Sequence, residues 1–270
     1  MYRLAGKRLE RTVVRVGSAA FGDGAFVMIA GPCAVESAEQ IEATAQVAAR
    51  AGAQVLRGGI YKPRTSPYAF QGLGDEGIPL IARAGRQSGL PAVVEALSEA
   101  HLDALRDHVG MVQIGARNMQ NFPLLRAAAR AGRPVLLKRA ASATLDEVLY
   151  AAEYILLEGN PNVVLCERGV RGFDPHTRNL FDLAGALRLR ELTHLPVIVD
   201  PSHATGRTSL VGPLVLAAAA AGLDGAIVET HPSPAAALSD GQQSLDFAQF
   251  VTMMQQLDSL GRTRRALQAV

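Results

Sequence analysis

The sequence lacks tryptophan, and only 5% of its residues are aromatic. Its two cysteines, Cys33 and Cys166, are too few to cross-link a chain of 270 residues, so we expect a reduced compartment. It also lacks a long apolar run, because the longest, LVLAAAAAGL, is well short of the roughly 20 residues that a membrane-spanning helix needs. The N-terminus carries scattered charges and no apolar core of a signal peptide. We therefore expect a cytoplasmic protein that does not enter a membrane.

Charge of one sign is not in large excess either. The 27 Lys and Arg residues and 25 Asp and Glu residues leave a formal net charge of +2, so a nucleic-acid partner is not indicated. Any basic site must then be a local concentration of cations. With 49% hydrophobic and 19% charged residues the chain can form a large core, and no proline-rich or low-complexity linker interrupts it. These features predict one globular domain.

Short β-branched apolar runs alternate with longer Ala- and Leu-rich stretches of helical period. Eight such runs begin at Phe26, Ala53, Pro91, Met111, Pro134, Asn162, Pro196 and Asp224. This alternation predicts βα units, a parallel sheet and, at this length, a (β/α)8 TIM barrel over residues 26–262. A doubly wound sheet is the structural alternative. Residues 1–25 are expected to form an extension with a short strand or hairpin near Val13 that caps the barrel, and residues 263–270 a C-terminal tail.

The carboxyl-terminal ends of all eight runs are polar, whereas their starts carry no comparable set of side chains. In a (β/α)8 barrel these ends meet at one rim, where active sites are assembled. The ends offer Cys33, Arg57, Glu95, Gln113 with Arg117, Lys138, Glu167 with Arg168, Asp200 with His203, and Glu229 with His231. Such a gathering of ionisable groups is typical of a catalytic mouth.

Six cations belong to this rim, and three of them lie in the stretch LRGGIYKPRTSPYAFQGLG at 56–74, whose glycines and prolines predict a loop. The six are Arg57, Lys62, Arg64, Arg117, Lys138 and Arg168. Taken singly, each could be a solvated rim charge or an ion-pair partner. Together they outnumber the carboxylates Glu95 and Glu167, so the pattern favours a phosphate or carboxylate ligand.

A second set combines metal-ligating groups. It consists of Cys33 after the first run, His203 in DPSH, Glu229 at the end of the eighth run and Asp240 in SDGQQS. One thiolate, one imidazole and two carboxylates suit a divalent transition ion such as Mn²⁺, Fe²⁺, Co²⁺ or Zn²⁺ better than Mg²⁺ or Ca²⁺. An alternative stays open, because Cys33 could be a buried apolar residue and Asp240 a turn residue.

Seven motifs follow one another along nearly the whole chain. They are GPCAVES (31–37), LRGGIYKPRTSPYAFQGLG (56–74), QIGARNMQN (113–121), LLKR (136–139), EGNPNVVLCERG (158–169), VDPSHATGR (199–207) and SDGQQSL (239–245). In this order they resemble the 3-deoxy-D-arabino-heptulosonate 7-phosphate (DAHP) synthases, in particular the short microbial type I beta-like subclass without an appended regulatory domain. Two positions depart from that pattern: Ala140 stands where we expect glycine, and Thr230 where we expect an apolar β-branched residue.

The resemblance implies a metal-dependent, aldol-like condensation of phosphoenolpyruvate with D-erythrose 4-phosphate and water. Its products would be DAHP and phosphate, in the first step of the shikimate pathway that leads to aromatic amino acids. The phosphate and carboxylate of phosphoenolpyruvate would be held by Arg57, Lys62, Arg117, Lys138 and Arg168.

The resemblance also implies roles for the remaining rim residues. Erythrose 4-phosphate would be received by Lys62, Pro63, Arg64, Thr65 and Ser66, with Arg64 taking its phosphate. One divalent metal ion would be held by Cys33, His203, Glu229 and Asp240 and would polarise the aldehyde oxygen. The candidates for handling the protons of the attacking water are Lys62, Glu95 and His203.

Two other functions stay open. One is the sister enzyme 3-deoxy-D-manno-octulosonate 8-phosphate synthase, which uses arabinose 5-phosphate and whose aldose loop differs from KPRTS. The other is a non-catalytic barrel that serves as a binding or regulatory subunit, although such a barrel should lack some of the ligands.

For the assembly, we expect a homo-oligomer, either a dimer or a tetramer, and leave open a separate regulatory partner. Feedback-regulated relatives carry an appended domain or a long extension, whereas about 25 residues precede the first barrel strand here. We therefore expect the chain to be insensitive to phenylalanine, tyrosine and tryptophan.

Overall fold

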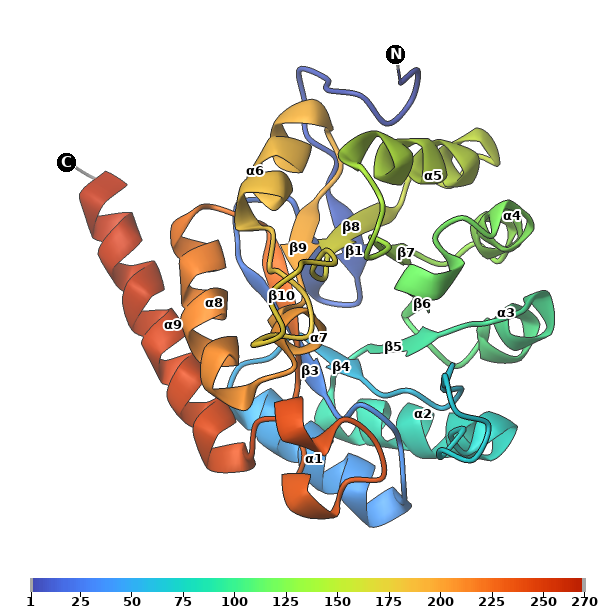
Figure 1. The fold of residues 1–270 in the computed structure, drawn as a ribbon, viewed down its shortest axis with the longest axis vertical. Coiled ribbons are helices and arrows are strands. Elements are labelled where there is room, and N and C mark those ends of the chain that lie inside the picture. The colour runs from blue at the N-terminus through green and yellow to red at the C-terminus, as the bar shows by residue number, and fades with distance from the viewer. Residues whose placement is uncertain (1, 269–270) are drawn as a thin grey trace.

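Eight short parallel strands close into a barrel in the computed structural model, which describes residues 2–268 and, within them, the side chains of residues 2–262. Each strand pairs with the next barrel strand in the sequence, and the last closes the ring against the first (Figure 1). The strands are β3 (Val27–Gly31), β4 (Val55–Arg57), β5 (Ala92–Glu95), β6 (Met111–Ile114), β7 (Val135–Lys138), β8 (Val163–Glu167), β9 (Val197–Val199) and β10 (Gly225–Glu229). This closed sheet confirms the predicted (β/α)8 barrel and excludes the doubly wound alternative.

Helices surround the barrel (Figure 1). They are α1 (Ala38–Arg50), α2 (Gly77–Ser88), α3 (Glu99–Leu105), α4 (Phe122–Arg130), α5 (Leu145–Leu157), α6 (Leu183–Leu192), α7 (Pro201–Thr205), α8 (Thr208–Ala220) and α9 (Phe247–Gln268), with 3₁₀ turns η1 (Gly74–Glu76), η2 (Ala116–Asn118), η3 (Pro234–Ala236) and η4 (Gly241–Gln243). Side chains fix where helices begin: Ser37 accepts a hydrogen bond from Gln40 N at 3.1 Å, and Thr144 and Glu147 form a capping box. Within residues 2–268, none of these helices has the length and apolarity needed to cross a membrane.

Residues of each barrel strand point alternately into the barrel and out toward the helices, as the period of two requires. In β3, Val27 and Ile29 join an apolar cluster inside the barrel, whereas Met28 and Ala30 join the cluster beneath the helices. The inward apolar residues of the other strands include Val55, Val93, Met111, Leu136, Val164, Ile198 and Ile227. The residue two positions further along each strand faces the same way, so this parity decides which strand-end side chains reach the mouth.

An N-terminal hairpin closes the opposite end of the barrel. Its strands β1 (Val14–Val16) and β2 (Ala19–Phe21) pair antiparallel, and their apolar side chains join the cluster inside the barrel. Phe21 is fully buried there. The hairpin confirms the expected N-terminal strand or hairpin. Because its apolar side chains fill this end of the barrel, a polar ligand must enter at the carboxyl ends of the strands.

Removing the Phe21 ring should therefore lower the stability of the barrel. We expect Phe21→Ala to reduce the free energy of unfolding by about 3 to 5 kcal/mol, because it leaves a cavity in a closely packed floor. Leu9→Ala is the matched control, since Leu9 is fully exposed and its truncation should change stability by less than about 0.5 kcal/mol. Urea denaturation followed by circular dichroism measures both, and equal stability of the two variants would contradict the role given to the floor.

Candidate active site

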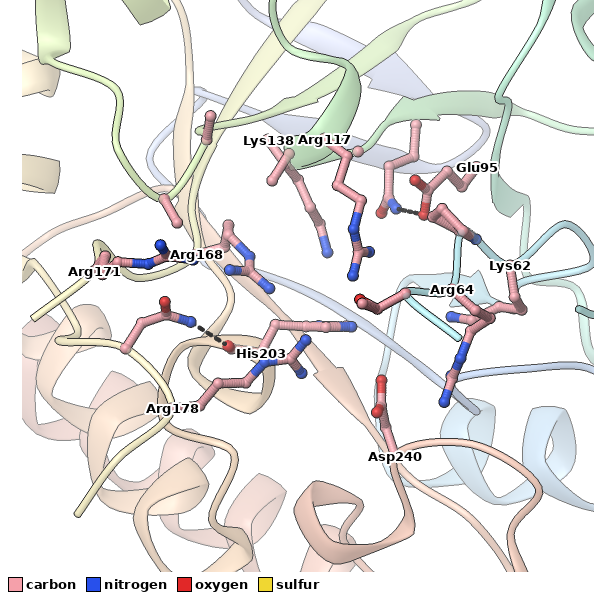
Figure 2. Close-up of a pocket in the computed structure, with 18 of the residues that line it drawn as sticks. Lys62, Arg64, Glu95, Arg117, Lys138, Arg168, Arg171, Arg178, His203 and Asp240 are labelled. Atoms are coloured by element: carbon pink, nitrogen blue, oxygen red, sulfur yellow. Dashed lines mark hydrogen bonds between the residues drawn. The ribbon is translucent and has the colours of Figure 1, made fainter. Parts of the chain in front are cut away.

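A cavity of about 770 Å³ lies at the carboxyl ends of the barrel strands (Figure 2). The alternation of side chains along the strands determines which residues line it. Arg57 follows the inward-facing Val55 by two residues, and Lys138 follows Leu136 in the same way, so both side chains enter the cavity. The volume is sufficient for small polar substrates.

Among the residues whose side chains the structure describes, eight cations line this cavity, and those labelled in Figure 2 surround a common space. They are Arg57, Lys62, Arg64, Arg117, Lys138, Arg168, Arg171 and Arg178. The carboxylates among the lining residues are Glu95 and Asp240. The lining therefore carries an excess of positive charge, which an anionic ligand would neutralise.

Sequence reasoning missed Arg171 and Arg178, because both lie in the connection from β8 to α6 and not at a strand end. The connection folds back on itself through a bridge between Val170 and Leu180. Backbone hydrogen bonds from Arg171 N to Ala141 O at 2.7 Å and from Arg178 N to Thr205 O at 2.9 Å hold it over the mouth. The available signal was that two more arginines closely follow Arg168.

Glu167 does not reach the mouth, so the prediction that placed it there is wrong. Glu167 is the last residue of β8 and directly precedes the inward-facing Arg168, so its side chain points outward. There its Oε2 accepts a hydrogen bond from Arg139 Nη1 at 2.9 Å. Burial raises the pKa of Glu167, although Arg139 opposes this effect. The mouth thus has one carboxylate fewer than the sequence indicated, which strengthens the case for an anionic ligand.

Asp200 is fully buried and connects two parts of the site. Its carboxylate pairs with Lys138 and lies 2.8 Å from His203 Nδ1, while its Oδ1 caps α7 by accepting from His203 N at 2.9 Å. Burial alone would raise the pKa of Asp200, but His203 and Lys138 hold it well below its usual range. An ionised Asp200 therefore links one cation of the cavity to a candidate metal ligand.

Cys33, His203, Glu229 and Asp240 each offer one ligand atom, and these four atoms all lie within 4.8 Å of one another. The residues come from separate segments: the loops after β3 and β10, the short helix α7 and the last position of β10. Cys33 Sγ lies 3.2 Å from Asp240 Oδ2, and His203 Nε2 lies 3.2 Å from Glu229 Oε1. The fold thus brings together the four residues that the sequence pattern singled out.

The backbone at Asp240 is unusual. Its φ is 50°, and no other non-glycine residue among residues 2–268 has a positive φ. Aspartate adopts this left-handed conformation more readily than most residues, and the neighbouring Gly241 cannot be replaced freely, because a Cβ there would lie 2.1 Å from Pro234 O. The turn aims the Asp240 carboxylate at Cys33 rather than at solvent, which argues against a simple turn residue.

The chemistry of these four residues fits a divalent transition ion. Burial, with the charge of Glu229, raises the pKa of the Cys33 thiol to about 12, so a strong cation is needed to hold its thiolate. Burial lowers the pKa of His203 and favours the neutral imidazole that a metal requires. Glu229 Oε1 is buried and accepts no hydrogen bond from any residue that the structure describes, although Arg57 Nη1 lies 3.0 Å away.

The loop that follows β4 forms one wall of the cavity, through Pro63, Arg64, Thr65 and Ser66. Its base is anchored. The buried Lys62 donates from Nζ to both the carbonyl oxygen and Sγ of Cys33 at 3.0 Å, and Lys62 N donates to Gln71 O at 2.8 Å. Tyr61 stacks on His101 with ring centroids 3.6 Å apart. The fixed base presents the more exposed Thr65 and Ser66 at the cavity edge.

Comparison with known proteins supports an assignment to a family. Residues 11–265 match the model of the DAHP synthetase I family. The chain is 48% identical over 261 residues to the phospho-2-dehydro-3-deoxyheptonate aldolase of Thermotoga maritima, covering 96% of this chain and 77% of that protein. It is 31% identical over 235 residues to a 2-dehydro-3-deoxyphosphooctonate aldolase of Acidithiobacillus ferrooxidans, covering 80% and 82% of the two chains.

Solved structures give the same result. The crystal structure of the Thermotoga maritima phospho-2-dehydro-3-deoxyheptonate aldolase (DAHP synthase) matches with a TM-score of 0.94 and 46% identity, over 97% of this chain and 77% of that one. A truncated form of 3-deoxy-D-arabino-heptulosonate 7-phosphate synthase from the same organism matches with a TM-score of 0.90 and 43% identity, over 97% of each chain. The family model spans most of the sequence, and the fold and its motifs agree with it, so this chain belongs to the DAHP synthetase I family.

Proposed function

We propose that this chain is a transferase that condenses phosphoenolpyruvate with D-erythrose 4-phosphate and water to give DAHP and inorganic phosphate. The observation that carries the proposal is the pairing, in one cavity, of eight cations with a cluster of four metal-ligating side chains. Two phosphorylated substrates need such an excess of cations, and the 48% identity to a DAHP synthase points to the same reaction.

The cations divide between the two substrates. Phosphoenolpyruvate is held through its phosphate and carboxylate by Arg57, Lys62, Arg117, Lys138 and Arg168. Burial and the neighbouring Arg178 lower the pKa of Arg168, while Asp200 raises it, so an arriving anion relieves repulsion between the arginines. Erythrose 4-phosphate lies against the loop of residues 62–66, where Arg64 takes the phosphate, with Thr65 and Ser66 as hydroxyl donors beside it.

In the reaction the enol carbon of phosphoenolpyruvate attacks the aldehyde carbon of the aldose and forms the new C–C bond. The aldehyde C=O π bond breaks, its oxygen takes up a proton and becomes a hydroxyl, and the adjacent carbon of phosphoenolpyruvate is left with positive charge. Water adds to that carbon and loses one proton. The bond from that carbon to the phosphate oxygen then breaks, the former water oxygen loses its second proton to the leaving phosphate and becomes the ketone oxygen, and inorganic phosphate is released. A divalent cation bound by Cys33, His203, Glu229 and Asp240 supplies Lewis-acid polarisation of the aldehyde oxygen. The surrounding cations hold both substrates so that the two carbons meet.

Glu95 is the residue that we assign to the proton lost by the attacking water. The other two candidates are committed elsewhere, since Lys62 donates to Cys33 Sγ at 3.0 Å and His203 belongs to the metal-ligating cluster. Glu95 lines the cavity apart from that cluster, and Gln113 Nε2 donates to its Oε2 at 3.0 Å. This hydrogen bond orients the carboxylate while its other oxygen abuts Gly115, where a Cβ would lie 2.0 Å from Oε1.

Further parts of the proposal concern the metal, the assembly and the location. The mixed thiol, imidazole and carboxylate set supports Mn²⁺, Fe²⁺, Co²⁺ or Zn²⁺ as the bound ion. A homo-oligomer is supported by exposed apolar side chains on the outer helices, such as Tyr150 and Leu157 on α5. A cytoplasmic location agrees with two unpaired, buried cysteines.

Phosphate release tests the reaction and its aldose. Metal-stripped protein is mixed with phosphoenolpyruvate and either erythrose 4-phosphate or arabinose 5-phosphate, with and without Mn²⁺. We expect release of phosphate only with erythrose 4-phosphate and Mn²⁺ together. Release with arabinose 5-phosphate would instead support the octulosonate reaction, although the Acidithiobacillus ferrooxidans enzyme of that name is only 31% identical to this chain. No release with either aldose would support a non-catalytic barrel.

The two cysteines provide a matched test of the metal ligands. Cys33→Ala should abolish turnover and Mn²⁺ binding, because it removes one ligand from the cluster. Cys166→Ala should retain both, since Cys166 belongs neither to the four ligand residues nor to the residues that line the cavity. Rates and metal content are measured side by side, and full activity of Cys33→Ala in the presence of a chelator would refute the metal assignment.

Arg64 tests the division of the cations. Arg64→Ala should raise the Michaelis constant for erythrose 4-phosphate roughly ten- to a hundred-fold and leave that for phosphoenolpyruvate nearly unchanged, because a charge-assisted phosphate contact is lost. Arg86→Ala, on the exposed face of α2, is the control. An increase for phosphoenolpyruvate alone would require the two substrate sites to be exchanged.

A further inference from the structure

Two adjacent glutamines follow Asp240, and the structure treats them differently. Gln242 is exposed, whereas Gln243 is only 1% exposed and lies in the turn η4, whose N-cap is Asp240. Gln243 Nε2 donates a hydrogen bond of 2.5 Å to Glu229 Oε2. A buried amide that hydrogen-bonds so closely to a candidate metal ligand does more than pack against its neighbours.

The other end of the same amide is held by Arg178. Arg178 Nη1 donates to Gln243 Oε1 at 3.4 Å, and the stem of Arg178 packs over Gly206, where a Cβ would come within 3.1 Å of Arg178 Cβ. A rotation of the amide by half a turn would place Oε1 against the Glu229 carboxylate and Nε2 against the guanidinium. Both contacts would be repulsive, so the amide has one favourable orientation.

This orientation gives the two oxygens of Glu229 different environments. Oε2 is occupied by the amide of Gln243. Oε1 accepts no hydrogen bond from the described residues; it lies 3.2 Å from His203 Nε2 in the metal-ligating cluster and 3.0 Å from Arg57 Nη1. The backbone of Glu229 is also fixed, because its N–H donates to Ser202 Oγ at 3.0 Å.

We infer that Gln243 is a positioning residue that holds Glu229 so that a single oxygen is presented to a divalent cation. The inference rests on the proposed metal site and adds to it a residue that does not itself bind the ion. A carboxylate fixed in this way loses less conformational freedom on binding the ion, so the Gln243 amide raises the metal affinity of the chain. Arg178 acts one step further out, by selecting the orientation of the amide.

The test compares the metal affinity of metal-free proteins. Gln243→Met keeps the length of the side chain but removes both hydrogen bonds, and Gln243→Asn keeps an amide that is too short to reach Glu229. Gln242→Met is the matched control at the exposed neighbour. Each protein is titrated with Mn²⁺ against a fluorescent chelator, its melting temperature is recorded without metal, and its Co²⁺ form is examined by visible absorption.

We expect both Gln243 variants to bind Mn²⁺ at least about tenfold more weakly than the wild type, with altered Co²⁺ absorption bands and a nearly unchanged metal-free melting temperature. Gln242→Met should match the wild type in all three measurements. Wild-type binding of Mn²⁺ together with unchanged affinity and Co²⁺ spectra in both Gln243 variants would overturn the inference and leave the proposed function standing. An equal loss of Mn²⁺ affinity in Gln242→Met would also overturn it. So would a loss of affinity that occurs only together with a collapse of the metal-free fold. A wild type that binds no Mn²⁺ would instead refute the metal site itself.

Discussion

The alternation of side chains along the barrel strands is the constraint on which the site depends. Each strand is short, so one inward apolar residue fixes that the residue two positions later, at the strand's end, enters the mouth. Val55 and Leu136 in this way direct Arg57 and Lys138 inward. The hairpin below fills the floor with apolar side chains, and the polar chemistry is therefore confined to one end of the barrel.

Two groups of side chains share that end, and their charges depend on each other. The cations would repel one another in an empty cavity, and the buried carboxylates of the metal-ligating cluster would not remain ionised without them. Burial alone would raise the pKa of Glu229, but the charges of Arg57 and Lys62 help to lower it. Asp200 contacts both Lys138 and His203 and makes the two groups one electrostatic unit. Binding of an anionic substrate and of a divalent cation should therefore support each other.

Much of this arrangement could be predicted from the sequence, because strand ends converge in any parallel barrel and the ligand types are chemically distinctive. The residues that were misplaced or missed from the sequence have physical explanations. Glu167 was misplaced because a difference of one residue in a strand reverses the direction of the side chain, and strand boundaries cannot be read that finely from composition. Arg178 was missed because a folded connection, not a strand, carries it to the mouth. The task of Gln243 depends on a contact of 2.5 Å that no spacing reveals.

The central claim is that the anion site and the metal site occupy the same cavity. The most direct measurement is the ³¹P relaxation rate of phosphoenolpyruvate in the presence of protein and Mn²⁺, since a paramagnetic ion accelerates relaxation steeply at short distance. We predict strong enhancement with the wild-type chain that disappears in Cys33→Ala, although phosphoenolpyruvate still binds. Unenhanced relaxation while both Mn²⁺ and phosphoenolpyruvate are bound to the wild type would contradict the account, because the two sites would then lie apart.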